Sequence, residues 1–299
     1  MKTRAAARTA QGDGKARPMA PSVGASTGLD GRLGASVELL KALHILTRDG
    51  RLNQDSRRKL KQVYHLCQFI EPILTELLTQ AGSNGVTLAD HGAGKSYLGF
   101  LLYDLFFKRR NDGHIYGIEA RDELVERSRQ LAGRLGFARM SFLSLRVEDS
   151  IDSTELPARV DIVTALHACD TATDDAIRFA LRRQAKHIVL VPCCQAEVAG
   201  VLRRRKNESF ATTPLSELWR HPIHTREFGS QLTNVLRCLQ LEAHGYQLVV
   251  TELVGWEHSL KNELILARRT GAMRRDAAAR LAGILRELKL DELHDRFLY

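Results

Sequence analysis

The segment Val86–Leu98 constrains the fold of this chain most strongly, because it predicts a buried strand, a tight turn and a helix start in direct succession. A short apolar run ends at Asp90, the chain turns on Gly92 and Gly94, and an amphipathic stretch follows. Glycine lets the backbone approach a ligand closely, and the first N–H groups of a helix lack partners within the helix. The segment therefore predicts a ligand-binding loop at the carboxyl end of a strand.

Strands and helices alternate along the chain after this loop. The predicted strands are 86–90, 114–119, 140–147, 160–166 and 187–191, and the predicted helices between them are 95–108, 121–135 and 173–183. Such alternation predicts a parallel sheet with helices on both faces. The last two predicted strands, 246–254 and 262–269, have no helix between them, so they should pair as a hairpin. We therefore expect an α/β, Rossmann-like sheet of seven strands with a terminal β-hairpin.

The sequence divides into four parts by composition and pattern. They are a disordered basic tail at 1–30, a helical N-terminal extension at 31–82, the sheet domain at 83–270 and a helical C-terminal tail at 271–299. The tail is rich in Gly, Ala, Ser, Pro and Arg and has little to bury. Apolar spacing predicts two helices in the extension, 36–48 and 55–80, with Pro72 bending or splitting the second.

Charge and cysteine content limit the possible partners. The formal net charge is +9 and the pI is about 9.5, which suits a nucleic-acid partner, although basic runs are equally often solvated faces. No apolar run approaches the roughly 20 residues that span a bilayer, and the basic start lacks the apolar core of a secretory signal. The five cysteines show no regular spacing and predict reduced thiols in a cytoplasmic protein.

Three kinds of ligand compete for the glycine loop. Gly94-Lys95-Ser96 matches the end of a phosphate-binding P-loop, but that motif needs glycine where this chain has Ala89. The dinucleotide pattern G-x-G-x-x-G is also incomplete, because Tyr97 stands at its third glycine. An acidic strand end followed by G-x-G, here Asp90 to Gly94, instead resembles the loop of class I S-adenosylmethionine-dependent methyltransferases.

Further polar residues stand where an adenosine-containing cofactor needs them. Glu119 ends the second strand, where a carboxylate can accept both ribose hydroxyls. Glu148 or Asp149, after the third strand, can accept from an adenine amino group. Each of these acids also has an ordinary alternative as a surface residue in a loop or at a helix start. The segment 167–174 places a polar cluster at the fourth strand end, and such clusters mark the ligand crevice of parallel sheets.

Four motifs together resemble one family of class I methyltransferases, over roughly residues 55–270. They are the Asp-x-Gly-x-Gly-Lys loop from Asp90, His-x-Cys-x-x-x-Thr-Asp from His167, Pro-Cys-Cys from Pro192 and the segment Glu257–Asn262. The family is related to eukaryotic tRNA 2′-O-methyltransferases, whose zinc-binding modules have no counterpart in this sequence. The resemblance implies a seven-stranded methyltransferase sheet, S-adenosyl-L-methionine as cofactor, and a cofactor site formed by Asp90, Gly92, Gly94, Glu119, Glu148, Asp149 and His167.

The predicted catalytic residues follow strands four and five. His167 is a candidate base or substrate contact, with Asp170 or Asp174 to orient it, although Asp170 is equally suited to cap the following helix. Cys193 is a candidate nucleophile for covalent attack on a pyrimidine, against the alternative of a buried structural thiol. The Asn/Asp-Pro-Pro-aromatic motif of base-amino methyltransferases does not follow strand four, which disfavours that reaction.

Strand-end histidines and cysteines also raise the question of a metal. His91, His167, Cys193 and Cys194 have no C-x-x-C pair and none of the tight spacing of zinc sites, so we expect no metal. The sequence thus predicts a methyltransferase with RNA as a candidate acceptor and no membrane association, and it indicates no oligomeric state. The alternative function is a non-catalytic RNA- or protein-binding module built on the same fold.

Overall fold

The computed structural model describes residues 36–47, 49–51, 54–81, 85–166, 168–204, 214–253 and 263–298. These residues belong to one compact unit that extends from Gly34 to Tyr299. The predicted tail at 1–30, His167 and the Glu257–Asn262 segment lie outside the described residues. Within the described part of the chain, no helix combines the length and apolar character needed to cross a membrane.

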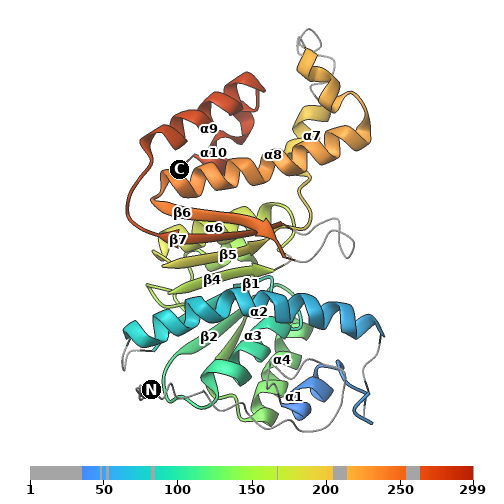
Figure 1. Cartoon of the computed structure of the whole chain (residues 1–299), viewed down its shortest axis with the longest axis vertical. Coiled ribbons are helices and arrows are strands. Elements are labelled where there is room, and N and C mark those ends of the chain that lie inside the picture. The colour runs from blue at the N-terminus through green and yellow to red at the C-terminus, as the bar shows by residue number, and fades with distance from the viewer. Residues whose placement is uncertain are drawn as a thin grey trace, which may run out of the picture. The chain divides into compact units, whose positions relative to one another are not determined.

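A single mixed sheet of seven strands lies at the centre, in the order β3-β2-β1-β4-β5-β7-β6 (Figure 1). The strands are β1 Thr87–His91, β2 His114–Glu119, β3 Met140–Ser144, β4 Ile162–Leu166, β5 His187–Val191, β6 Tyr246–Glu252 and β7 Glu263–Arg269. The first five are parallel, whereas β7 runs antiparallel to both β5 and β6. The predicted Rossmann-like sheet of seven strands with a terminal hairpin is confirmed.

The chain reverses its direction of travel across the sheet between β1 and β4. The connections from β1 lead outward through β2 to β3, and the chain then returns to place β4 on the other side of β1. In open parallel sheets, ligands bind outside the carboxyl ends of the strands at such a reversal point. The topology therefore directs attention to the residues that follow β1, β2, β4 and β5.

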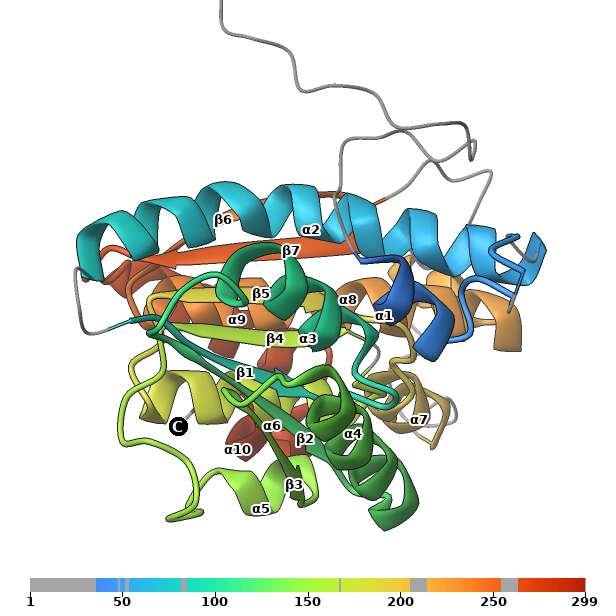
Figure 2. The same cartoon turned by 90° about the horizontal axis from the view of Figure 1, so that it is seen from below.

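Helices cover both faces of the central strands, and β5 is accordingly buried along its whole length. Figure 2 shows α2 (Gln54–Ala81) and α3 (Tyr97–Leu102) on one side of the sheet and α6 (Thr171–Arg182) on the other. The remaining helices of this region are η1 Tyr103–Phe107, a π-helical turn that continues α3, and α4 Asp122–Leu135 and α5 Val147–Ser150. Burial on both faces explains why the central strands are near-continuous apolar runs.

The N-terminal extension is a short helix, α1 (Val37–Ala42), followed by the long helix α2. The sequence left open a split at Pro72, but α2 continues through this residue, which is exposed. Among the side chains described from Tyr64 onward, the buried ones on this helix are Leu66, Cys67, Ile70, Leu74 and Leu77. Their apolar contacts stabilise one continuous helix despite the backbone hydrogen bond that proline removes.

The C-terminal residues form part of a second apolar core. The elements are α7 Glu197–Arg204, η3 Pro214–Trp219, α8 Pro222–Ala243, α9 Arg275–Glu287, η4 Asp291–Leu293 and α10 His294–Phe297. Leu281, Leu285 and Phe297 pack with Leu236 of α8 in one buried cluster. Arg296 also pairs with Glu197, at 3.2 Å between Nε and Oε2, which ties the chain end to α7.

Candidate functional site

The glycine loop passes closely over the end of β4. Gly92 and Gly94 have φ angles of 65° and 58°, a backbone region that residues with a Cβ rarely adopt. A Cβ on Gly92 would lie 3.3 Å from the Cα of Ala168, which follows β4. The N–H of Ala93 donates to the Ile118 carbonyl at 3.0 Å and so links the loop to β2. The positive φ angles favour glycine at both positions, and the close approach to Ala168 adds a steric reason at Gly92.

Glu119, at the end of β2, faces this loop. Its Oε2 accepts from the backbone N–H of Gly94 at 2.7 Å, and its Oε1 accepts from Nε of Arg121 at 2.8 Å. Burial alone would raise the pKa of Glu119, but these hydrogen bonds outweigh it and hold the pKa below the ordinary value. An ionised carboxylate offers about four lone-pair positions, so it retains capacity for ligand hydroxyls.

A cavity of about 330 Å³ opens beside Glu119. It brings together Gly92, Glu119 and Glu148 among the predicted cofactor residues, with Ala168 and Cys169 on the side of β4. Asp149 is exposed and does not line it. The cavity therefore unites residues from the carboxyl ends of β1, β2, β3 and β4.

The acids after β3 lie on a short helix, which corrects the sequence prediction. The third strand was expected to continue to Val147, but β3 ends at Ser144, and Val147–Ser150 form α5. Glu148 pairs with Arg146 at 2.8 Å, and both side chains are about half exposed or more. An exposed ion pair of this kind contributes little stability, so Glu148 can exchange partners at little cost.

Asp90 lies beneath the loop and not in the cavity lining. Only 2% of its surface is exposed, and its Oδ1 accepts from the Thr164 hydroxyl on β4 at 2.7 Å. Burial raises the pKa of Asp90 to about 7, because desolvation of the carboxylate outweighs the hydrogen bond from Thr164. Asp90 is thus a group whose charge depends on pH near neutrality.

The raised pKa predicts that ionised Asp90 destabilises the protein. An unfolded aspartate titrates near pH 3.9, so between that pH and about 7 the folded state retains a proton that the unfolded state has lost. The free energy of unfolding should therefore fall as pH rises through this window. We expect Asp90→Asn to stabilise the protein more at about pH 8 than at about pH 5. Thermal melts of both proteins at both pH values test this, and equal differences in Tm would contradict it.

His91, the last residue of β1, is a core side chain. It is fully buried, its ring lies 4.5 Å from that of Phe179 in an edge-on contact, and its Nε2 lies 3.1 Å from the Ser150 hydroxyl. Burial lowers the pKa of His91 to about 3, so the ring is neutral at physiological pH. The sequence placed His91 among possible metal ligands, but its side chain packs among α5 and α6.

Asp170 joins the loops that follow β4 and β5. Its side chain does not cap α6, the alternative considered from the sequence; instead its Oδ1 accepts from the N–H groups of Ala196 and Glu197, at 2.9 and 3.2 Å, at the start of α7. The Asp170 N–H donates to the Cys194 carbonyl at 2.5 Å. Its φ of 50° is uncommon for a non-glycine residue, and these bonds fix it.

A buried ion pair between α6 and α8 also holds the loop that follows β4. Arg237 of α8 donates through Nε and Nη2 to the two carboxylate oxygens of Asp174, at 2.6 and 2.9 Å. Their side chains are 0% and 3% exposed. Arg237 also donates to the Asp170 carbonyl at 2.9 Å and to Oδ1 of Asn234 at 3.2 Å. The sequence motif indicated Asp174, but nothing in it indicated the arginine 63 residues later.

The cysteines after β4 and β5 converge. Cys169 Sγ lies 3.6 Å from Cys193 Sγ, and the sulfur atoms of Cys169, Cys193 and Cys194 all lie within 4.8 Å of one another. Burial, with the neighbouring Cys169 and Cys194 thiols, raises the pKa of Cys193 to about 12. Cys193 is therefore a thiol at neutral pH unless a cation joins the group.

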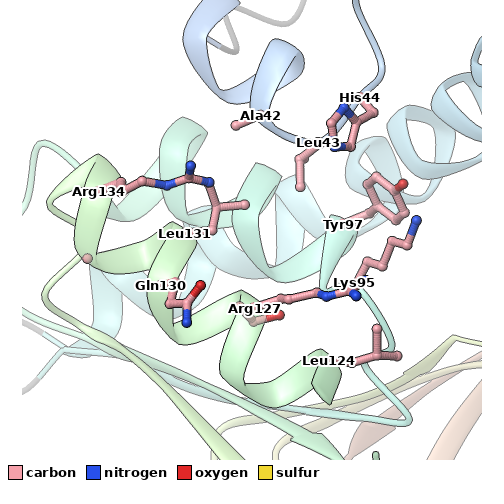
Figure 3. A pocket seen from close by; sticks show the side chains of 12 residues that line it. Ala42, Leu43, His44, Lys95, Tyr97, Leu124, Arg127, Gln130, Leu131 and Arg134 are labelled. Carbon is pink, nitrogen blue, oxygen red and sulfur yellow. The ribbon is translucent and has the colours of Figure 1, made fainter. Parts of the chain in front are cut away.

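A second, larger cavity of about 580 Å³ lies between α1, the start of α3 and α4. Figure 3 shows Lys95, Arg127 and Arg134 around it, together with His44 and Tyr97. No acidic side chain is among the described residues that line it. Because Lys95 directly follows Gly94, this basic cavity adjoins the glycine loop.

Comparisons with known proteins match parts of this chain. Residues 58–201 match a family described as "Methyltransferase domain". A curated relative, the glutathione S-transferase C-terminal domain-containing protein homolog of Drosophila pseudoobscura pseudoobscura, is 29% identical over 138 residues, which cover 37% of this chain and 22% of that protein. The match thus spans about a fifth of the length of that relative.

Solved methyltransferases are similar to the chain at low identity. The magnesium protoporphyrin IX methyltransferase of Synechocystis PCC 6803 is 14% identical, with a TM-score of 0.42 over 78% of this chain and 94% of that one. The precorrin-6y C5,15-methyltransferase of Geobacter metallireducens GS-15 is 17% identical, with a TM-score of 0.39 over 68% and 88%. The family match, with the seven-stranded topology, supports a class I methyltransferase domain whose indicated cofactor is S-adenosylmethionine.

Proposed function

We propose that the protein is an S-adenosylmethionine-dependent methyltransferase whose acceptor is RNA. The observation that carries the RNA assignment is the basic cavity beside the glycine loop, lined by Lys95, Arg127 and Arg134 without a described acid. Phosphate groups of a nucleic acid bind such cationic surfaces. The net charge of +9 also favours association with a polyanion such as RNA.

We assign the cofactor to the cavity beside Glu119. Glu119 is an ionised acceptor placed for ribose hydroxyls, Glu148 stands at the edge where an adenine amino group would donate, and Gly92 leaves room for close backbone approach. Gly94, whose N–H already holds Glu119, shapes the loop beneath the methionine part. The remaining proposed cofactor residues are Asp149, Asp90 and His167. Asp149 is an alternative to Glu148, and Asp90 lies beneath the loop.

The bound cofactor supplies an electrophilic methyl group, and the protein's task is to orient the acceptor for in-line displacement. We propose His167, after β4, as the base or acceptor contact. Asp170 acts as a positioning residue, since its carboxylate is engaged by the N–H groups of Ala196 and Glu197. These bonds hold the β4 and β5 loops, between which the acceptor would lie, in one arrangement.

Covalent attack by Cys193 is the second mechanistic candidate. It needs a thiolate, whereas burial and the adjacent thiols raise the pKa of Cys193 to about 12. Direct transfer to a hydroxyl or nitrogen is therefore favoured over covalent activation of a pyrimidine. A Cys193→Ser protein should form no less product per bound cofactor if the covalent route is absent. Complete loss of transfer with unchanged cofactor affinity would restore that route if Cys169→Ser, which leaves the Cys193 thiol in place, retains transfer.

RNA binding through the basic cavity predicts a distinct salt dependence. We expect Arg127→Ala/Arg134→Ala to weaken binding of a single-stranded RNA and to reduce the slope of log affinity against log salt by about 0.7 for each phosphate that is no longer neutralised. Fluorescence anisotropy between about 50 and 200 mM salt measures both. The matched control is Arg159→Ala, an exposed arginine before β4 at the opposite end of the strands. If Arg159→Ala changes RNA affinity and its salt dependence as much as the double change does, the basic cavity is not the RNA-binding site.

The acceptor class is tested with labelled cofactor and separate fractions of cellular RNA, protein and metabolites. Label in the RNA fraction that disappears with ribonuclease supports the proposal, and label in protein or metabolites alone contradicts it. The remaining alternative, a non-catalytic RNA- or protein-binding module, predicts no transfer to any fraction and no measurable affinity for S-adenosylmethionine.

A further inference from the structure

We propose that Cys169, Cys193 and Cys194 form a binding site for one Zn²⁺ ion beside the cofactor cavity. The three sulfur atoms lie within 4.8 Å of one another, and those of Cys169 and Cys193 are 3.6 Å apart. Three thiolates are a soft donor set, which selects Zn²⁺ over Mg²⁺ or Ca²⁺. The site is independent of the identity of the methyl acceptor.

The sulfur spacing fits tetrahedral coordination. A Zn–S distance of about 2.3 Å places two sulfurs of a tetrahedral site about 3.8 Å apart. The observed separations, 3.6 Å for Cys169 and Cys193 and at most 4.8 Å for the other pairs, require only small side-chain adjustments to reach this value. A disulfide would instead need the two sulfurs at about 2.05 Å, a much larger displacement.

The backbone around the cluster is fixed by tertiary contacts. Cys169 follows β4, Cys193 and Cys194 follow β5, and these strands are paired neighbours in the parallel sheet. Asp170 links the two loops, with its N–H on the Cys194 carbonyl and its carboxylate on the first N–H groups of α7. The three thiols are therefore held together before any ion binds, which lowers the cost of assembling the site.

The site leaves one coordination position open. Cys169 and Cys194 are exposed and Cys193 is half-buried, so a fourth ligand can approach from solvent. Zinc sites with three protein ligands and an open position bind and activate an incoming oxygen, nitrogen or sulfur donor. Since Cys169 also lines the cavity beside Glu119, a ligand of this ion would lie next to the proposed cofactor.

Metal titration of the full chain tests the site without any activity measurement. Protein purified with reductant should contain about one equivalent of zinc by elemental analysis. After removal of metal by a chelator, Co²⁺ should restore about one equivalent and produce the near-ultraviolet sulfur-to-cobalt absorption and the intense visible bands of tetrahedral thiolate coordination. Absence of the charge-transfer band at saturating Co²⁺ would overturn the proposal.

Single substitutions assign the ligands. Cys169→Ser, Cys193→Ser and Cys194→Ser should each lose the sulfur-to-cobalt band or weaken Co²⁺ affinity by at least about tenfold. Cys238→Ser, a half-buried cysteine of α8 outside the cluster, should bind as the unchanged protein does. Circular dichroism confirms that each variant is folded. An unchanged band in all three cluster variants would overturn the zinc assignment. Copper in place of zinc in the purified protein would overturn it as well.

Discussion

Replacing Arg237 with alanine is expected to lower the free energy of unfolding by about 3–5 kcal/mol. The change removes both hydrogen bonds to Asp174 and leaves that carboxylate buried without its cation, since its side chain is 3% exposed. It also removes the donor to the Asp170 carbonyl, so the loop beneath the cysteines is held less firmly. Urea unfolding at neutral pH measures the decrease.

Two further variants separate the buried pair from arginine truncation in general. Arg182→Ala breaks another arginine–aspartate contact, to Asp152 at 2.6 Å, but those side chains are 62% and 76% exposed. We expect it to cost less than about 1 kcal/mol. The double change Asp174→Leu/Arg237→Met removes both buried charges and should recover much of the stability that Arg237→Ala removes. Equal destabilisation by Arg182→Ala and Arg237→Ala would contradict the proposed role of burial.

Replacing Glu119 with alanine is expected to reduce affinity for S-adenosylmethionine at least about a hundredfold. Two hydrogen bonds from ribose hydroxyls to a charged acceptor contribute roughly 1.5–3 kcal/mol each, and the alanine variant makes neither. The variant also releases the Gly94 N–H and Arg121, which hold the carboxylate at 2.7 and 2.8 Å. Isothermal titration with the cofactor gives the affinity directly.

The control for this change is Glu155→Ala, an exposed glutamate outside the cavity, which should bind the cofactor normally. Arg121→Ala separates positioning from direct binding. It removes a largely exposed cation and leaves the carboxylate in place, so it should cost much less affinity than Glu119→Ala. If Glu119→Ala binds the cofactor as tightly as the unchanged protein, the cofactor assignment of this cavity is wrong.

Local patterns were sufficient for the sheet because strand signals are short-range. The predicted strands at 114–119 and 187–191 coincide with β2 and β5, and the absence of a helix between the last two strands correctly predicted the hairpin. The third strand was predicted three residues too long, because the apolar Leu145 and Val147 extend the strand pattern past its end at Ser144. Helix α5 begins at Val147, and the acidic residues Glu148 and Asp149 in its first turn favour a helix N-terminus.

Pro72 shows how tertiary packing overrides local propensity. A proline inside a helical pattern by itself predicts a bend or break. In the structure the residue is exposed, while Ile70 and Leu74 on either side of it are fully buried, and the helix is continuous. Apolar burial over a long helix compensates for one missing backbone hydrogen bond.

The sequence alone determined the parallel sheet, its hairpin and the glycine loop that Glu119 faces, because each depends on residues close together in one strand or turn. Only the tertiary structure decided that Asp174 pairs with Arg237, that His91 turns into the core and that Cys169 meets Cys193. Asp174 and Arg237 are 63 residues apart in the chain, and Cys169 and Cys193 are 24 apart. His91 and its contact Ser150 are 59 residues apart. Such contacts form where the ends of parallel strands and packed helices converge. A local sequence pattern does not predict which distant side chains will be in contact there.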